Sequence, residues 1–172
     1  MKTMLKRFGP SSARIALLLV AAVVGAACGS TGPTLKVNTE PTGPIGAFKS
    51  VKLMCTAEDE KERGKELTGR METQLLVKLK ERETFAEYKL SKDEGNTDVT
   101  LKVVILDVKK AGGWGWYGRS SSKVSCDATL TDNKTNTVVV ALSVVAKPKF
   151  SSVETALEDA AMQIADYLRE KK

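Results

Sequence analysis

Apolar and polar residues alternate along several stretches of the chain, and this period of two predicts β-strands. In Val99–Ile105 and in Val124–Leu130 every second residue is apolar, and most residues between them are polar. A shorter alternation predicts a strand over residues 48–55. Two further strands are expected around Thr84–Leu90 and over the apolar run Thr137–Ala146. The pattern therefore predicts a sheet of about five strands.

Two other stretches have apolar residues at steps of three and four, which predicts amphipathic helices. The first stripe lies within the charged segment 57–83 and consists of Leu67, Met71, Leu75, Leu76 and Leu79. The second lies near the C-terminus and consists of Val153, Leu157, Ala160, Ala161, Ile164 and Leu168. Ser151 and Glu154 have the spacing of a capping box at its start. The order β-α-β-β-β-β-α predicts an α+β fold, in which one mostly antiparallel or mixed sheet carries both helices on one face.

The first 27 residues are typical of an export signal. Four basic residues and no acidic residue precede Ile15–Ala27, a run of 13 apolar and small residues. A membrane-spanning helix needs about 20 residues, so this shorter run with a basic head indicates a secretory signal peptide. Its removal takes four of the 27 basic residues and none of the 21 acidic ones, which leaves 23 against 21, a net charge of +2. We therefore expect no binding to nucleic acid.

Cys28 directly follows the signal. Residues 25–28, Gly-Ala-Ala-Cys, resemble the lipobox of bacterial lipoproteins, although Gly25 stands where leucine is usual. The resemblance implies that the Cys28 thiol is joined to diacylglycerol and that the chain is cut before it. An ordinary signal-peptidase site is the alternative. Because Gly29 and not aspartate follows the cysteine, the resemblance also implies the outer membrane and a periplasm-facing domain, with the inner membrane and the cell surface as alternatives.

Composition predicts three regions. Residues 1–27 are the signal peptide, residues 28–46 are the lipidated cysteine and a flexible linker rich in glycine and proline, and residues 47–172 are one globular α+β domain. The globular part retains Cys55 and Cys126, both on apolar faces of predicted strands. In an exported protein they could form a disulfide, or they could remain two separate buried thiols. The sequence leaves both open.

The second half of the chain resembles a family of bacterial envelope lipoproteins of unknown function. The matching features are a glycine-aromatic loop that contains Arg119, a hairpin that runs from Asp132 to Val138, and an alanine-rich terminal helix. The family has glycine where this chain has Asn136, and asparagine tolerates the left-handed conformation that such a turn needs. The order of elements is also similar to lipoprotein activators of penicillin-binding proteins and to the N-terminal domain of the Tol–Pal β-propeller protein. These resemblances imply a partner-binding domain that is not an enzyme.

Candidate catalytic chemistry is sparse. The chain has no histidine, which excludes Ser-His-Asp and Cys-His arrangements and most zinc sites. Its carboxylates show no spacing that would place a pair in an apolar pocket. The G-x-G-x-x-G sequence at 113–118 precedes a strand and not a helix, so it does not predict a phosphate site. We therefore expect no catalytic residue, no metal and no cofactor, and a hydrolase using carboxylates alone is the least favoured reading.

The loop at residues 111–121 is the candidate partner-binding site. Its candidate residues are Trp114, Trp116, Tyr117 and Arg119. Aromatic side chains beside cations are typical of protein interfaces and of membrane headgroup contacts. The alternative is that the rings fold back as a lid over one end of the sheet.

Together these features predict a non-enzymatic lipoprotein, attached to the membrane through Cys28, whose domain binds another envelope component, most simply a protein. The alternative is a domain that binds an anionic glycan or lipid, such as peptidoglycan or lipopolysaccharide.

Overall fold

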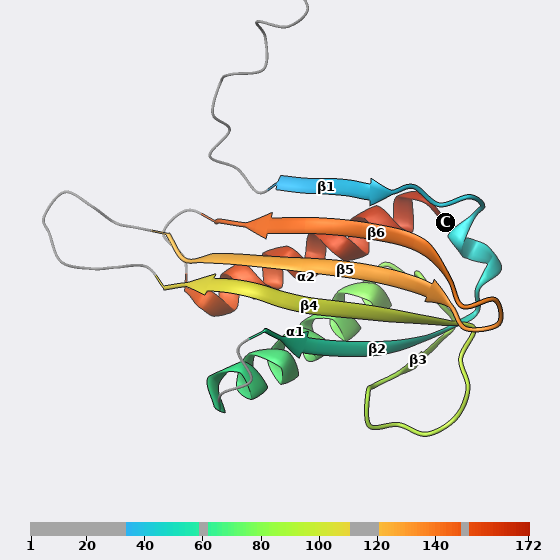
Figure 1. The fold of residues 1–172 in the computed structure, drawn as a ribbon, viewed down its shortest axis with the longest axis horizontal. Coiled ribbons are helices and arrows are strands. Elements are labelled where there is room, and N and C mark those ends of the chain that lie inside the picture. The colour runs from blue at the N-terminus through green and yellow to red at the C-terminus, as the bar shows by residue number, and fades with distance from the viewer. Residues whose placement is uncertain (1–33, 59–61, 111–120, 149–151) are drawn as a thin grey trace, which may run out of the picture. The chain divides into compact units, whose positions relative to one another are not determined.

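The structure is a computed structural model, and it describes residues 34–58, 62–110, 121–148 and 152–172 of the chain. One sheet is backed by two helices that both lie on the same face (Figure 1). The strands are β1 (Thr34–Thr39), β2 (Ser50–Ala57), β3 (Glu87–Lys89), β4 (Val99–Lys109), β5 (Lys123–Asp132) and β6 (Thr137–Ala146). The helices are α1 (Glu62–Glu81), α2 (Val153–Glu170) and the short 3₁₀ helix η2 (Ile45–Ala47). The predicted α+β fold is confirmed, with six strands in place of about five.

The strands follow the order β1-β6-β5-β4-β2-β3 across the sheet. β2 runs parallel to both of its neighbours, β3 and β4, while all other neighbouring pairs are antiparallel. The sheet is therefore mixed. The connection from β2 through α1 to β3 is a crossover between parallel strands, which is why this half of the chain needs a helix between its strands.

The core lies between the sheet and the two helices. On β5 the alternating residues Val124 to Leu130 are at most 1% exposed, and the predicted stripe of α2 is buried against β5 and β6. Helix α2 begins at Val153, and its cap is Ser152, whose side chain accepts a hydrogen bond from the backbone N–H of Thr155. The cap is therefore one residue later than the capping box predicted at Ser151, which lies outside the described residues.

The predicted flexible linker over residues 28–46 is wrong for its second half, because that half is folded. β1 pairs with β6, and Leu35 and Val37 pack against the core. Further along, the Ile45 side chain is fully buried, and its backbone N–H donates to the carbonyl oxygen of Lys171 at 3.1 Å. Proline is compatible with edge strands and turns, so the proline-rich composition did not exclude an edge strand here.

The face of the sheet opposite the helices is open within the described residues. It is a mixed surface on which Met54 and Leu106 are each 37% exposed. A chain of hydrogen bonds crosses three of its strands, because Asn38 donates to the Ser143 hydroxyl and Ser143 donates to the Asp127 carboxylate, at 2.8 and 2.7 Å. Among the described elements, the two helices cover only the opposite face.

Candidate functional site

The residues singled out in the sequence divide into two groups. The lipidation candidate Cys28 and the loop candidates lie outside the described residues; the loop candidates are Trp114, Trp116, Tyr117 and Arg119. The two remaining cysteines are described. The structure describes the strands on either side of the candidate loop. The two ends of the sheet differ in their charged and polar residues.

Cys55 and Cys126 are both free thiols. They lie on β2 and β5, and β4 runs between these two strands. Two strand spacings amount to about 9.6 Å, which exceeds the Cα separation of about 7 Å that a disulfide can bridge. Burial raises the pKa of both thiols, that of Cys126 to about 12. Of the two alternatives that the sequence left open, the structure has two separate thiols, Cys126 buried and Cys55 partly buried.

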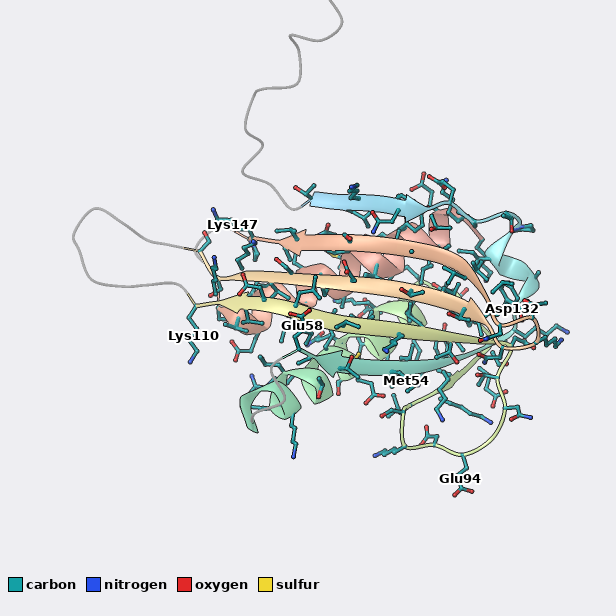
Figure 2. The ribbon with its side chains drawn as sticks, viewed as in Figure 1. Met54, Glu58, Glu94, Lys110, Asp132 and Lys147 are labelled. Carbon is teal, nitrogen blue, oxygen red and sulfur yellow. The ribbon has the colours of Figure 1, made fainter. Side chains whose placement is uncertain are left out.

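The first end, which we call the basic end, contains Lys109, Lys110, Lys123 and Lys147. Figure 2 shows Lys110 and Lys147 at one end of the sheet and Asp132 at the other. Lys109 is directly opposite Lys123 in the ladder between β4 and β5. Because Val124 is opposite Ala146, the same register continued by one residue places Lys123 opposite Lys147. Three lysines thus form one row across β4, β5 and β6.

This row has few acidic neighbours within the described residues. Lys109 is 3.9 Å from a carboxylate oxygen of Asp107, and its side chain is 71% exposed. The other three lysines of the basic end form no ion pair within 4 Å in the described part of the chain. Like charges directly opposite each other in a ladder destabilise a sheet. The stability of the fold therefore does not explain why lysines gather at the basic end.

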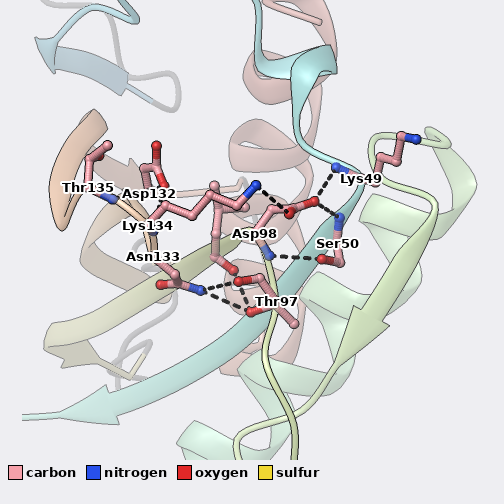
Figure 3. Close-up of polar contacts among 9 residues, drawn as sticks. Lys49, Ser50, Thr97, Asp98, Asp132, Asn133, Lys134 and Thr135 are labelled. Carbon is pink, nitrogen blue, oxygen red and sulfur yellow. Dashed lines mark hydrogen bonds and ion pairs between the residues drawn. The ribbon is translucent and has the colours of Figure 1, made fainter.

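The second end, which we call the clasp end, is a network of polar contacts around Asp98 (Figure 3). The Asp98 carboxylate accepts hydrogen bonds from the backbone N–H groups of Lys49 and Ser50, at 2.8 and 3.1 Å. In return the Asp98 backbone N–H donates to the Ser50 hydroxyl at 2.8 Å. These reciprocal bonds join the start of β2 to the start of β4.

Asn133 adds the hairpin between β5 and β6 to the clasp. Its backbone N–H donates to the Asp98 carbonyl oxygen at 2.9 Å, and its side-chain amide donates to the Thr97 carbonyl oxygen at 2.9 Å. The hairpin itself turns through Asn136, which has a φ of 54°. The left-handed conformation expected for Asn136 is therefore confirmed.

The charges of the clasp end are held in their ordinary ionised forms. The N–H groups of Lys49 and Ser50 lower the pKa of Asp98, and the N–H of Lys134 lowers the pKa of Asp132. A general acid at neutral pH would need the opposite shift, a raised pKa. Around these residues lies a cavity of about 550 Å³ with a largely polar lining that includes the side chains of Lys52 and Lys134. The Asp98 carboxylate also lines it, and the hydroxyl and amide side chains offer hydrogen-bond partners to a hydroxyl-rich ligand.

The sequence pattern does not indicate the contacts of Asp98 and Asp132 in the clasp. The available signal was local, since Asp132 begins a turn that its own carboxylate bonds to, at 2.8 Å from the N–H of Lys134. The contact of Asp98 with Lys49 spans 49 residues and needs the parallel pairing of β2 with β4, which the sequence pattern did not indicate.

No group of three or more cysteine, aspartate or glutamate side chains within the described residues could hold a metal ion. Among the helices of the described segments, none has the length and apolar character needed to cross a bilayer.

Known proteins match this chain in fold and not in sequence. No family model and no curated protein matches it. PelC from Paraburkholderia phytofirmans, whose structure is a dodecamer, aligns at a TM-score of 0.57 and 13% identity over 80% of this chain and 97% of PelC. A DUF330 protein from Xanthomonas campestris aligns at a TM-score of 0.51 and 15% identity, over 80% and 90% of the two chains. A minor lipoprotein from Acinetobacter baumannii aligns more loosely, at 0.40 and 15% identity over 72% and 94%.

Identities this low establish a shared fold and nothing about shared ligands. The first two alignments show that this chain has the fold of PelC and of the DUF330 protein. These alignments cover 97% and 90% of those two chains.

Proposed function

We propose that this chain is a non-enzymatic lipoprotein of the bacterial envelope, anchored through Cys28 to the outer membrane, whose domain binds another envelope protein on the periplasmic side. The observation that carries the proposal is the lipobox-like sequence at residues 25–28, which only five residues separate from the first strand at Thr34. A signal of this kind with a folded domain directly after it is the arrangement of a surface-bound protein.

The open face of the sheet supports partner binding. It carries half-exposed apolar residues such as Met54 and Leu106 next to polar side chains, a mixture that is typical of non-obligate protein interfaces. The loop residues Trp114 and Trp116 remain part of this proposal, because aromatic residues dominate the binding energy of many interfaces.

The anchor is tested by the intact mass of the chain recovered from a Gram-negative host. We expect a processed chain that starts at Cys28 and carries a diacylglycerol, and membrane fractions that contain it. The Cys28→Ser variant should appear without lipid in the soluble periplasmic fraction. A processed wild-type chain without lipid contradicts the proposal.

Partner binding is tested by photo-cross-linking in intact cells. A photoreactive residue is placed at Lys102, which is exposed on the open face, or at Trp116 in the loop. Val77 on α1, 42% exposed, is the matched control on the helical face. We expect one defined cross-linked protein from Lys102 or Trp116 and none from Val77. Because PelC forms a dodecamer, a second copy of this chain is one partner that the mass of the product would identify. Equal, diffuse labelling at all three positions contradicts the proposal.

A second candidate function is binding of an anionic glycan, and the cavity at the clasp end favours it. Lys52 and Lys134 line this cavity together with hydroxyl and amide side chains. Soluble peptidoglycan fragments and lipopolysaccharide are the probes. Binding that weakens with salt and in the Lys52→Gln/Lys134→Gln double variant would support it, whereas binding unchanged in that variant would exclude the cavity as the site.

A further inference from the structure

We propose that the basic end of the domain binds the headgroups of anionic phospholipids and so holds the sheet end-on to the membrane. This inference rests on the proposed lipidation of Cys28. It adds a second, electrostatic contact between the domain and the same membrane, and it fixes which end of the domain faces outward.

The first argument is the reach of the anchor. From Cys28 to Thr34 the chain has six residues to extend, which span at most about 20 Å. The strand β4 has 11 residues and is therefore about 35 Å long. Thr34 pairs with Val145, and Lys147 follows two residues after Val145. The anchor therefore joins the domain at the basic end. It is too short for the opposite end of the sheet to reach the membrane.

The second argument is the arrangement of the lysines. Lys109, Lys123 and Lys147 form the row across three strands, and Lys110 is adjacent to Lys109. Lys109, Lys110 and Lys147 are exposed, and Lys123 is half-buried. Such a row is unfavourable by itself, but lysines close to an anionic membrane surface are attracted to it. An anionic lipid surface is therefore the partner whose attraction offsets the repulsion between these lysines.

The third argument is how the two contacts combine. The diacylglycerol proposed on Cys28 supplies two lipid chains, which already give stable attachment, so the role of the lysines is to set the orientation of the domain at the membrane. Attraction between exposed charges extends about 8 Å at physiological salt, so the lysines act only when they lie at the headgroups. Among the described residues at the ends of β2 and β4, the acidic ones are Asp107, beside Lys109, and Glu58, whose backbone N–H donates to the Ile105 carbonyl oxygen. Glu154, in the first turn of α2, is paired with Arg70.

The proposal is tested on the lipidated full chain in vesicles. The chain is reconstituted into phosphatidylcholine vesicles with or without about one third phosphatidylglycerol, and exposed lysines are acetylated and counted by mass spectrometry. With phosphatidylglycerol, we expect several-fold slower acetylation of Lys110 and Lys147 than without it. Lys92 and Lys134, which are exposed outside the basic end, should react equally in both vesicles. About 0.5 M salt should remove the difference.

A matched pair of variants separates charge from position. In Lys109→Gln/Lys123→Gln the protection of Lys110 and Lys147 should fall, and in Lys92→Gln/Lys134→Gln it should persist. Circular dichroism of each variant checks that the fold is retained.

The intact mass of the same sample keeps the two proposals apart. A lipidated chain whose Lys110 and Lys147 react equally in both kinds of vesicle overturns the headgroup contact and leaves the anchor in place. A chain without lipid overturns the anchor and this inference with it.

Discussion

The two ends of the sheet differ in how their charges are satisfied. At the clasp end the Asp98 carboxylate accepts two backbone hydrogen bonds and lies 3.9 Å from the Lys134 ammonium. At the basic end Lys109 and Lys123 stand opposite each other in the ladder. The clasp end therefore stabilises the fold, whereas the basic end exposes positive charge that slightly lowers the stability of the fold.

The largest expected effect comes from Ile45, which is fully buried beside the C-terminus of α2. Ile45→Ala should lower the free energy of unfolding by about 3 kcal/mol, because it removes buried methyl groups and leaves a cavity. Leu35→Ala, at the opposite end of the same segment and only half-buried, should cost less than half as much. Urea denaturation of both variants measures the difference. Equal losses in the free energy of unfolding would contradict the expected difference between the two positions.

Asp98 should make the clasp end sensitive to acid. Its pKa is lowered in the folded state by the N–H groups of Lys49 and Ser50, so its ionised form stabilises the fold above the unfolded pKa of about 3.9. That contribution is lost as the pH falls through the folded pKa. Asp98→Asn should be less stable at neutral pH and should lose less stability between pH 5 and pH 2. The measurement is denaturation at a series of pH values, and parallel curves would contradict it.

Tyr167, near the C-terminus of α2, should make the fold sensitive to alkali. Burial and a hydrogen bond to Glu40 raise the pKa of Tyr167 to about 12. The neutral phenol therefore stabilises the fold below the unfolded pKa of about 10, and this stability is lost as the pH rises toward 12. Tyr167→Phe should cost about 1 kcal/mol at neutral pH and should flatten the loss above pH 10. Ultraviolet titration of the phenol gives an independent reading of its pKa.

The smallest expected effect is a gain at the basic end. Lys123→Glu replaces a like-charge pair with an opposite-charge pair against Lys109, which should stabilise the free domain by about 0.5 kcal/mol at low salt. The same change should weaken the contact with anionic vesicles. Thermal denaturation at low and high salt measures the gain, which should shrink as salt screens both charges. A destabilised variant would show that this row supports the fold.

The strands with clean alternation and the two helices could be predicted from the sequence. A period of two for strands, or steps of three and four for helices, is a local pattern that needs no long-range information. It did not reveal β1, because only Leu35 and Val37 alternate there and the flanking prolines and glycines are typical of linkers. The clasp was missed for another reason. Asp98 meets Lys49 only through the parallel pairing of β2 with β4, and no local pattern encodes which strands become neighbours.

The entry of the anchor through an edge strand also has a mechanical consequence. If the membrane pulls on Cys28 while a partner holds the open face, tension enters at Thr34 and runs along β1. The bonds between β1 and β6 lie across that direction, so they are loaded together in shear and do not open one after another like a zipper. This edge strand would then set the force at which β1 is pulled out of the sheet.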